Sequence, residues 1–309
     1  METEHHSGSR SYIPIAILCN LLWGSAIPFI NIGYRLFDIG PGQTGSQILF
    51  AGCRFFLAGL ITVAIRSLSL KRAALPKRES LGAVCILALF QTIGQYVLFY
   101  IGVAHTASVK ASIIQGLGAF VSILIASYLF HYEKMGLEKW IGGALGILGV
   151  IVVNWRSGGF GGSVTFLGEG FLLLSMISNA MSAGLIKRYG QQDDPVTLSG
   201  CQFTLGGAVM AVCGFAFGGR LHPQGLPAFL ILLYLAVLSA AAYSLWAMLL
   251  KTYPVSRVAV FIFLQPLFGV ILGILLVHQK MEIPAIQYII SLILICACIV
   301  IINRPGKES

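Results

Sequence analysis

Residues 46–65 read SQILFAGCRFFLAGLITVAI, and this stretch decides the fold class of the chain. About 20 residues of this apolar character cross a hydrocarbon core of about 30 Å as a helix. Arg54 is the single charged residue in the stretch. An arginine at the centre of a spanning helix costs about 2.5–3.5 kcal/mol on insertion scales, so it normally faces a polar interior. We therefore expect a membrane protein that encloses a wet, positively charged place.

The composition of the whole chain agrees with a membrane protein. Hydrophobic residues make up 57% of the 309 and charged residues 10%, whereas soluble domains carry about 25% charged residues. The net charge is +9, but the basic residues lie in short loops between apolar segments. Their position is explained by membrane topology, so we expect no nucleic-acid partner. The first apolar segment has no cleavage site and is interpreted as a membrane helix.

Dividing the chain into crossings of about 20 residues predicts an all-α integral membrane protein with ten helices. The loops between them are too short for a soluble domain. The expected helices cover residues 11–33, 46–66, 80–103, 107–130, 137–155, 165–187, 196–218, 226–250, 255–277 and 282–302.

The distribution of basic residues predicts the orientation. An even number of helices places both termini on one side of the membrane. With the termini inside, fourteen of the 20 lysines and arginines fall in inner segments and five in outer segments. Because cytoplasmic loops carry an excess of Lys and Arg, both termini are predicted to be cytoplasmic.

An internal repeat relates the two groups of five helices. HYEKM at residues 131–135 resembles VHQKM at residues 277–281. Two similar halves with an odd number of helices must insert in opposite orientations. Inverted repeats of this kind are common in secondary transporters, where substrate binds near the midplane between the halves.

The chemistry-bearing residues argue against an enzyme. The seven cysteines include no Cys-x-x-Cys pair, and the six histidines lie in the N-terminal tail or at expected helix ends. The sequence contains no Walker A, HExxH or GxSxG motif. We expect no catalytic residues, no metal and no cofactor.

Polar and aromatic side chains inside the expected spans are the candidate substrate site. One interpretation is that they hydrogen-bond between helices; the other is that they line a central cavity for a small solute. Arg54 would either attract an anion or bind backbone carbonyls, and Lys110 and Arg257 are expected to snorkel to an interface. The candidate substrate-binding residues are Arg54, Trp23, Gln91, Gln95, Tyr96, Gln115, Asn179, Gln202, Tyr243 and Trp246.

Four motifs carry a resemblance to a known family: LLWGSAIPF at residues 21–29, RFFLAGL at 54–60, LGEGFLLLS at 167–175 and FLQPLFGVILG at 263–273. With these motifs in this order along the sequence, the chain resembles the EamA-type branch of the drug/metabolite transporter superfamily. The resemblance implies two inverted five-helix repeats, residues 11–156 and 165–303, around a central cavity. Residues 1–10 and 304–309 would be cytoplasmic tails. It also implies movement of small metabolites, often export, without a cofactor.

We therefore predict a multi-pass protein of the cytoplasmic membrane that moves a small organic solute by alternating access. Export is the expected direction, and the expected assembly is a monomer or homodimer in the lipid bilayer. Two other classes stay open, a non-transporting scaffold or sensor and a membrane-embedded enzyme. The sequence does not identify the solute or the energy source.

Overall fold

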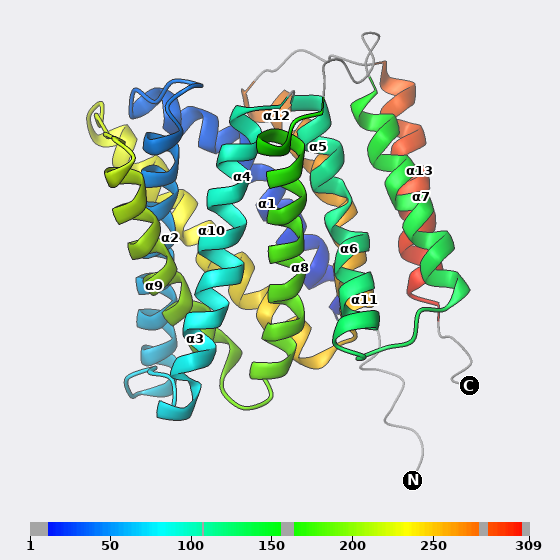
Figure 1. Ribbon diagram of the computed structural model, residues 1–309, viewed down its shortest axis with the longest axis horizontal. Coiled ribbons are helices and arrows are strands. Elements are labelled where there is room, and N and C mark those ends of the chain that lie inside the picture. Colours follow the sequence, from blue (N-terminus) through cyan, green and yellow to red (C-terminus); the bar gives the residue numbers. More distant parts are fainter. Residues whose placement is uncertain (1–11, 107, 156–163, 278–283, 305–309) are drawn as a thin grey trace.

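A computed structural model describes residues 12–106, 108–155, 164–277 and 284–304. Throughout these ranges the regular structure is helical and no strand occurs (Figure 1). The α-helices are α1 (Tyr12–Leu36), α2 (Thr44–Leu70), α3 (Leu81–Leu87), α4 (Gln95–Ala104), α5 (Ser108–Gly116), α6 (Gly118–Leu124), α7 (Leu137–Asn154), α8 (Phe171–Tyr189), α9 (Pro195–Ala216), α10 (Leu226–Thr252), α11 (Val255–Ala259), α12 (Gln265–Val277) and α13 (Ala285–Ile302).

Short segments of other helical types join or interrupt these helices. A 3-10 turn, η2 (Arg78–Ser80), precedes α3, and another, η6 (Val260–Leu264), connects α11 to α12. Three segments are π-helical: η3 (Ala88–Gly94), η4 (Ile125–Leu129) and η5 (Phe166–Gly170). Segments of π-helix are rare and frequently lie at functional sites.

Nine helices in the described part of the chain are long and apolar enough to cross a membrane, and Ile113–Leu129 is a shorter apolar helix. Large apolar side chains such as Leu68, Val212 and Ile293 are exposed on the outside of the bundle. Exposed leucine and isoleucine suit a lipid solvent, because hydrocarbon imposes no penalty on them. The prediction of an all-α membrane protein is confirmed.

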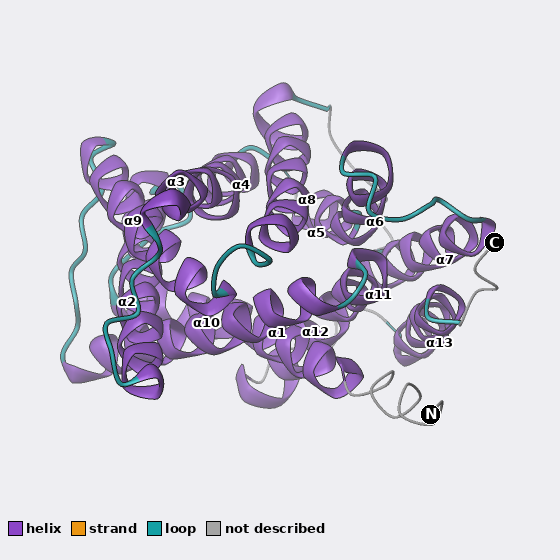
Figure 2. Cartoon of the chain, turned by 90° about the horizontal axis from the view of Figure 1, so that it is seen from below, coloured by secondary structure: helices purple, strands orange, loops and turns teal. Residues whose placement is uncertain are grey.

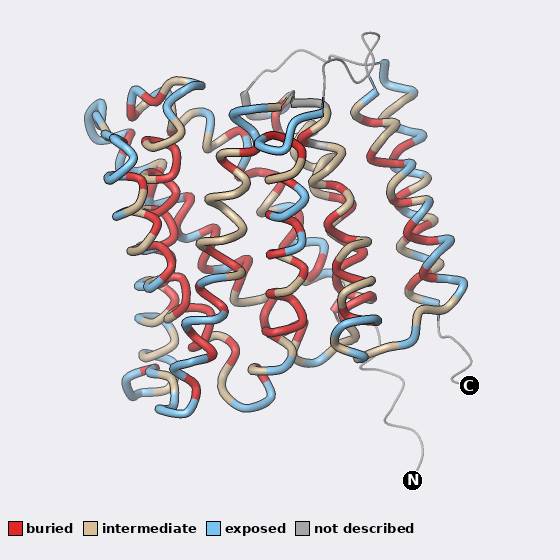
Figure 3. Tube along the Cα trace, viewed as in Figure 1, coloured by how far each residue is buried: buried red, intermediate tan, exposed pale blue. Residues whose placement is uncertain are grey.

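The helices form two rows that are closed at both ends by a helix pair (Figure 2). One row contains α10, α1 and α12, and α1 packs against both neighbours. The opposite row contains α4, α8 and α6, and α8 packs against both of its neighbours. The pair α2 and α9 closes one end of the rows, and the pair α7 and α13 closes the other. In Figure 3 the buried positions extend through the middle of the bundle, while the exposed positions lie at its two ends and along the outer helices.

The closing pair α2 and α9 is held at short range by glycines. Gly52 on α2 and Gly207 on α9 lie so close to the other helix that a Cβ would overlap the backbone of Ala211 and of Phe56, respectively. Small residues let membrane helices approach in this way, which increases their van der Waals contact. The result is a tightly packed wall beside Arg54, which lies on α2.

The two ends of the described chain meet on one side of the bundle. The Tyr12 hydroxyl at the start of α1 donates a hydrogen bond of 2.6 Å to Asn303 Oδ1, just after α13. The same side carries the loop between α2 and α3 and the loop between α8 and α9, which Lys77 Nζ joins by donating to the backbone oxygen of Gln192 at 2.9 Å. Arg66, in the last turns of α2, forms an ion pair of 2.7 Å with Asp194 beside these loops.

Candidate functional site

Arg54 lies in the interior of the bundle. Its side chain projects from α2 and the residue is 4% exposed. Arg54 Nε donates a hydrogen bond of 2.9 Å to Ser239 Oγ on α10, and Ser239 Oγ in turn donates to the backbone oxygen of Leu235 at 2.8 Å. The guanidinium carbon also lies 5.1 Å from the centre of the Phe55 ring. Ser239 therefore fixes one edge of the guanidinium and leaves the two Nη groups pointing elsewhere.

Aromatic side chains from five helices surround this arginine. Phe55 of α2 stacks on Phe203 of α9 at 5.4 Å between ring centres and 10° between ring planes. The hydroxyl groups of Tyr96 on α4 and Tyr243 on α10 are hydrogen-bonded to each other. The Trp23 ring of α1 lies 4.9 Å from the Tyr243 ring. Residues from both rows of helices thus converge on Arg54.

The charge of Arg54 reaches four tyrosine hydroxyl groups, those of Tyr34, Tyr96, Tyr100 and Tyr243. No ion pair joins Arg54 to a carboxylate within the described ranges. A hydroxyl group is a weak partner for a full charge in a low-dielectric interior. The guanidinium is therefore buried without a counter-charge from the described chain.

Two indole rings extend the aromatic wall. Trp246 of α10 is buried, and its ring lies 5.0 Å from that of Trp23. Trp23 contacts three separate hydrophobic clusters of the bundle, so it stands at their junction. Its Nε1 is buried and has no hydrogen-bond acceptor among the described residues. A buried donor without an acceptor costs about 1–3 kcal/mol, so Trp23 Nε1 is available to an acceptor that enters the bundle.

Gln91 and Gln202 form a second polar centre, in which both amide atoms of Gln202 are hydrogen-bonded. Gln202 on α9 is 0% exposed; its Nε2 donates to Gln91 Oε1 at 2.9 Å, and its Oε1 accepts from Thr92 Oγ1 at 2.7 Å. These bonds join the π-helical segment η3 to α9. These contacts agree with the interpretation that the two glutamines form hydrogen bonds between helices.

The other three candidates do not join the cluster around Arg54. Gln95 is half-buried, and its Oε1 has no partner in the described part of the chain. Gln115 on α5 and Asn179 on α8 are half-buried, and their side chains form none of the hydrogen bonds recorded among described residues. Of the ten candidates, five therefore meet at one place: Arg54, Trp23, Tyr96, Tyr243 and Trp246.

A short internal similarity, which the sequence analysis missed, links the two polar centres. Residues 51–59 read AGCRFFLAG and residues 199–207 read SGCQFTLGG, so Arg54 aligns with Gln202 and Phe55 with Phe203. Ser239 and Thr92, the hydroxyl partners of this aligned pair, are separated by the same 147 residues as Tyr243 and Tyr96. The two aligned stretches thus carry the same kinds of side chain, except that one has an arginine where the other has a glutamine.

Ionic clusters hold both ends of the bundle. Lys110 Nζ lies 3.0 Å from Glu169 Oε1, and Thr106 Oγ1 donates to the same oxygen at 2.7 Å. The side chain of Lys110 is 11% exposed and pairs with Glu169 at this end of the bundle, so snorkelling to the interface stays a prediction. At the other end Glu133 accepts from Lys139 Nζ at 2.7 Å and from Ser256 N at 2.9 Å.

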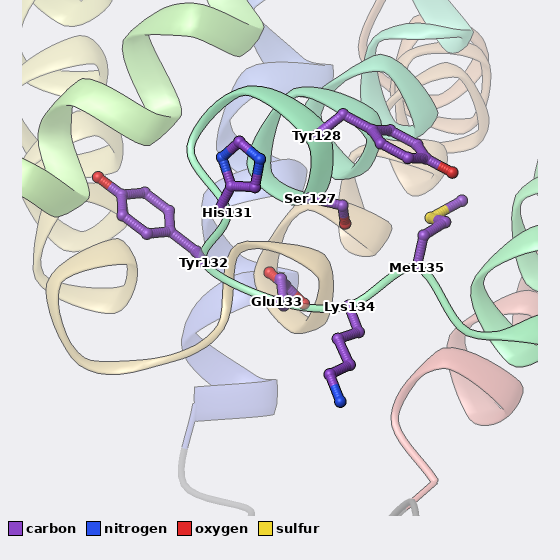
Figure 4. A pocket seen from close by; sticks show the side chains of 7 residues that line it. All are labelled: Ser127, Tyr128, His131, Tyr132, Glu133, Lys134 and Met135. Carbon is purple, nitrogen blue, oxygen red and sulfur yellow. The ribbon is translucent and has the colours of Figure 1, made fainter. Parts of the chain in front are cut away.

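A cavity of about 450 Å³ lies at the end of the bundle in the turn that follows η4 (Figure 4). None of the ten candidate residues lines it, and its only carboxylate, Glu133, is already bound to Lys139 and Ser256. We assign no role to this cavity. Its lining residues are Ser127, Tyr128, His131, Tyr132, Glu133, Lys134 and Met135.

No group of three His, Cys, Asp or Glu side chains that could hold a metal occurs in the described ranges. The chemistry around Arg54 consists of guanidinium, hydroxyl, indole and phenyl groups. Groups of these kinds can bind and orient a solute.

An all-helical bundle of membrane-spanning helices with a buried charge in its interior is compatible with a membrane transporter, and the family match assigns that class. The EamA-like transporter family matches residues 10–155 and 166–304, and the chain belongs to this family.

Named relatives agree with this assignment. The uncharacterized transporter YvbV of Bacillus subtilis is 26% identical over 264 residues, which cover 84% of this chain and 83% of the relative. An uncharacterized transporter of Archaeoglobus fulgidus is 26% identical over 279 residues, covering 88% and 91%. The uncharacterized inner membrane transporter YedA of Escherichia coli K12 is 26% identical over 261 residues, covering 82% and 78%.

The fold also matches a solved crystal structure. The two chains align with a TM-score of 0.74 over 93% of this chain and 94% of the other, at 18% identity. At 18% identity this similarity supports the fold and nothing further.

Proposed function

We propose that the protein is a secondary transporter that exports a small organic solute across the cytoplasmic membrane by alternating access. The observation that carries the proposal is the centre around Arg54, where helices from both rows converge on one buried charge. Transporters of this plan bind substrate near the midplane between two halves. The proposed substrate-binding residues are Arg54, Trp23, Tyr96, Tyr243 and Trp246, with Gln95 as a further polar neighbour.

We propose that the halves are inverted five-helix repeats, residues 11–156 and 165–303. The aligned stretches at 51–59 and 199–207 support this, since they lie on α2 and α9, which pack against each other. The row contacts support it too, because α1 packs on α10 and α12 as α8 packs on α4 and α6. The shorter apolar helix Ile113–Leu129 would be the tenth span.

The Tyr96–Tyr243 contact is the proposed point of closure between the two rows. The two tyrosines come from α4 and α10, one in each proposed repeat, and a single hydroxyl-to-hydroxyl bond joins them. Separating α4 from α10 breaks that bond and opens a path to Arg54. Such rocking of one repeat against the other is the usual form of alternating access.

We also propose that both termini lie in the cytoplasm. The excess of Lys and Arg on one side supports this orientation, and the name of the relative YedA, an inner membrane transporter, supports the location in the cytoplasmic membrane. Residues 1–10 and 304–309 would then be cytoplasmic tails. A monomer or a homodimer is compatible with this plan.

The experiment is transport by purified protein in proteoliposomes. Vesicles with and without the protein are incubated with a mixture of cellular metabolites, and the vesicle contents are identified by mass spectrometry. We expect at least one solute to accumulate only where the protein is present. If no solute distinguishes the two kinds of vesicle, transport by this chain alone is contradicted.

A further inference from the structure

The inference starts from the unsatisfied charge of Arg54. An arginine carries five N–H donors and stays protonated in proteins. Arg54 uses Nε for Ser239, and no hydrogen bond to its two Nη groups is formed within the described chain. The residue as a whole is 4% exposed, and its Nη groups are not fully enclosed by the described chain. The Nη groups are therefore free to receive an acceptor from a ligand.

The second half of the protein supplies an internal comparison. Gln202 occupies the position that aligns with Arg54, and both of its amide atoms are bound, to Gln91 and Thr92. The two aligned positions thus differ in charge and in whether all of their side-chain nitrogen and oxygen atoms form hydrogen bonds. The neutral one joins helices, whereas the cationic one retains unused donors, so a ligand would bind on the Arg54 side.

A cationic ligand finds no partner in this interior. The described acidic residues all lie in loops or near helix ends, away from the middle of the spans. Glu169 and Glu133, at the two ends of the bundle, already form ion pairs with Lys110 and Lys139, respectively. The described acidic residues are Asp38, Glu79, Glu133, Glu138, Glu169, Asp193 and Asp194.

The remaining surface around Arg54 suits an apolar, flat body. Phe55, Phe203 and Tyr243 are buried and pack on one another with ring centres 4.7–6.4 Å apart. The rings of Tyr96 and Trp23 beside them, in contrast, are only half-buried and offer surface to a ligand. Trp23 adds a buried N–H donor at the side of Tyr243. A ring-bearing ligand gains stacking on these rings, and its acidic group meets the guanidinium and the indole N–H.

We propose that the transported solute is an organic anion, with a carboxylate or similar oxyanion bound by both Nη groups of Arg54 and a ring-bearing body held among Phe55, Tyr96, Tyr243 and Trp23. Ser239 is a positioning residue, since it holds Nε and directs the Nη edge toward the ligand. The inference rests on the proposed transport function and adds the chemical class of the substrate.

The test is binding to the purified full-length protein, followed by tryptophan fluorescence. Trp23 and Trp246 lie at the site and report its occupation. The probes are benzoate, its neutral analogue benzamide and the cation benzylammonium. We expect saturable binding of benzoate, with an affinity at least about tenfold higher than that of the other two, because a charge-assisted pair is lost in them.

Two variants test whether benzoate binds at Arg54. Arg54→Gln is expected to weaken benzoate binding at least about tenfold. Arg35→Gln makes the same change at an exposed position at the end of α1 and should leave affinity unchanged. The comparison of the three probes on the unmodified protein needs no variant, so the proposal stays testable if Arg54→Gln does not fold.

Several results would overturn the proposal. These are equal binding of benzamide and benzoate, preferred binding of benzylammonium, absence of benzoate binding, or unchanged benzoate affinity in a folded Arg54→Gln protein. Displacement of benzoate by inorganic phosphate at equal concentration would overturn the ring-bearing part. A protein that transports a neutral solute but fails this binding test retains the proposed function and loses the anion assignment.

Discussion

At the scale of single residues, the burial of Arg54 has to be compensated. A charge at the centre of the bilayer costs about 2.5–3.5 kcal/mol on insertion scales. One hydrogen bond to Ser239 and one aromatic face offset part of this cost. Phe55 and Ser239 thus help to keep the arginine inside the bundle, and the proposed anion would complete the compensation.

Ser239 should act on the ligand through Arg54. In Ser239→Ala the Nε bond disappears and the guanidinium gains freedom, so we expect benzoate affinity to fall about three- to tenfold, in line with about 1 kcal/mol per hydrogen bond. Ser239→Thr keeps the hydroxyl and should restore most of the affinity. Fluorescence titration measures both. Equal weakening in the two variants would assign Ser239 to packing instead of positioning.

Asp194 is a second residue with a defined electrostatic role, at the edge of the membrane. Burial raises the pKa of its carboxyl, but hydrogen bonds from Arg66 and Thr197 outweigh burial and hold the pKa below its ordinary value. A lowered pKa in the folded protein contributes stability above the ordinary value of about 3.9. This contribution is lost as the pH falls through the folded value.

Asp194→Asn should therefore lower the unfolding temperature near neutral pH and progressively less below about pH 4. The amide still caps α9, so the difference reports the charge. Thermal unfolding in detergent across a pH series is the measurement. Asp38→Asn, the same change at an exposed position, is the control. A difference that stays constant into strong acid would mean that the Arg66 pair contributes nothing.

At the scale of helices, close approach of backbones explains the strongest contact in the bundle. Gly52 and Gly207 remove the side chains that would keep α2 and α9 apart. Lipid offers no hydrophobic force between helices, so packing of this kind has to hold them. The wall beside Arg54 is consequently tightly packed. The row of α4, α8 and α6, in contrast, is flanked by the π-helical segments η3 and η4.

Gly207→Ala should destabilise the protein. The new Cβ meets the Phe56 backbone, which cannot move aside as a flexible side chain would, so a cost of about 1–3 kcal/mol is expected from overpacking. Gly82→Ala is the matched control, because nothing lies within 4 Å of its Cβ. Thermal unfolding in detergent compares the two. A Gly207→Ala protein as stable as the control would contradict the close packing of α2 and α9.

Composition and spacing predicted the helices well, because hydrocarbon thickness imposes a length that every span has to meet. They predicted the polar partners poorly. Ser239 is one serine beside three alanines, and nothing in its local sequence indicates that Arg54 reaches it from α2. The bonded pair Gln91–Gln202 depends on how η3 faces α9, and helical periodicity of 3.6 residues does not describe a π-helical turn.

At the scale of the whole molecule, the proposed inverted repeat predicts where loops are exposed. Gly42, between α1 and α2, should lie outside the cell, and Arg72, after α2, should lie inside. Single cysteines at these positions in a cysteine-free protein should differ in labelling of intact cells by an impermeant maleimide. We expect Gly42→Cys to react and Arg72→Cys to react only after permeabilisation. The reverse pattern would invert the orientation.

The most direct measurement is the metabolite transport experiment repeated with Arg54→Gln and Arg35→Gln protein beside the unmodified protein. The solutes that the unmodified protein moves should be organic anions at neutral pH. Arg54→Gln should lose most of their transport, and Arg35→Gln should keep it. Transport of cations or neutral solutes, or an unchanged set of solutes in a folded Arg54→Gln protein, would contradict the assignment of Arg54 as the anion site.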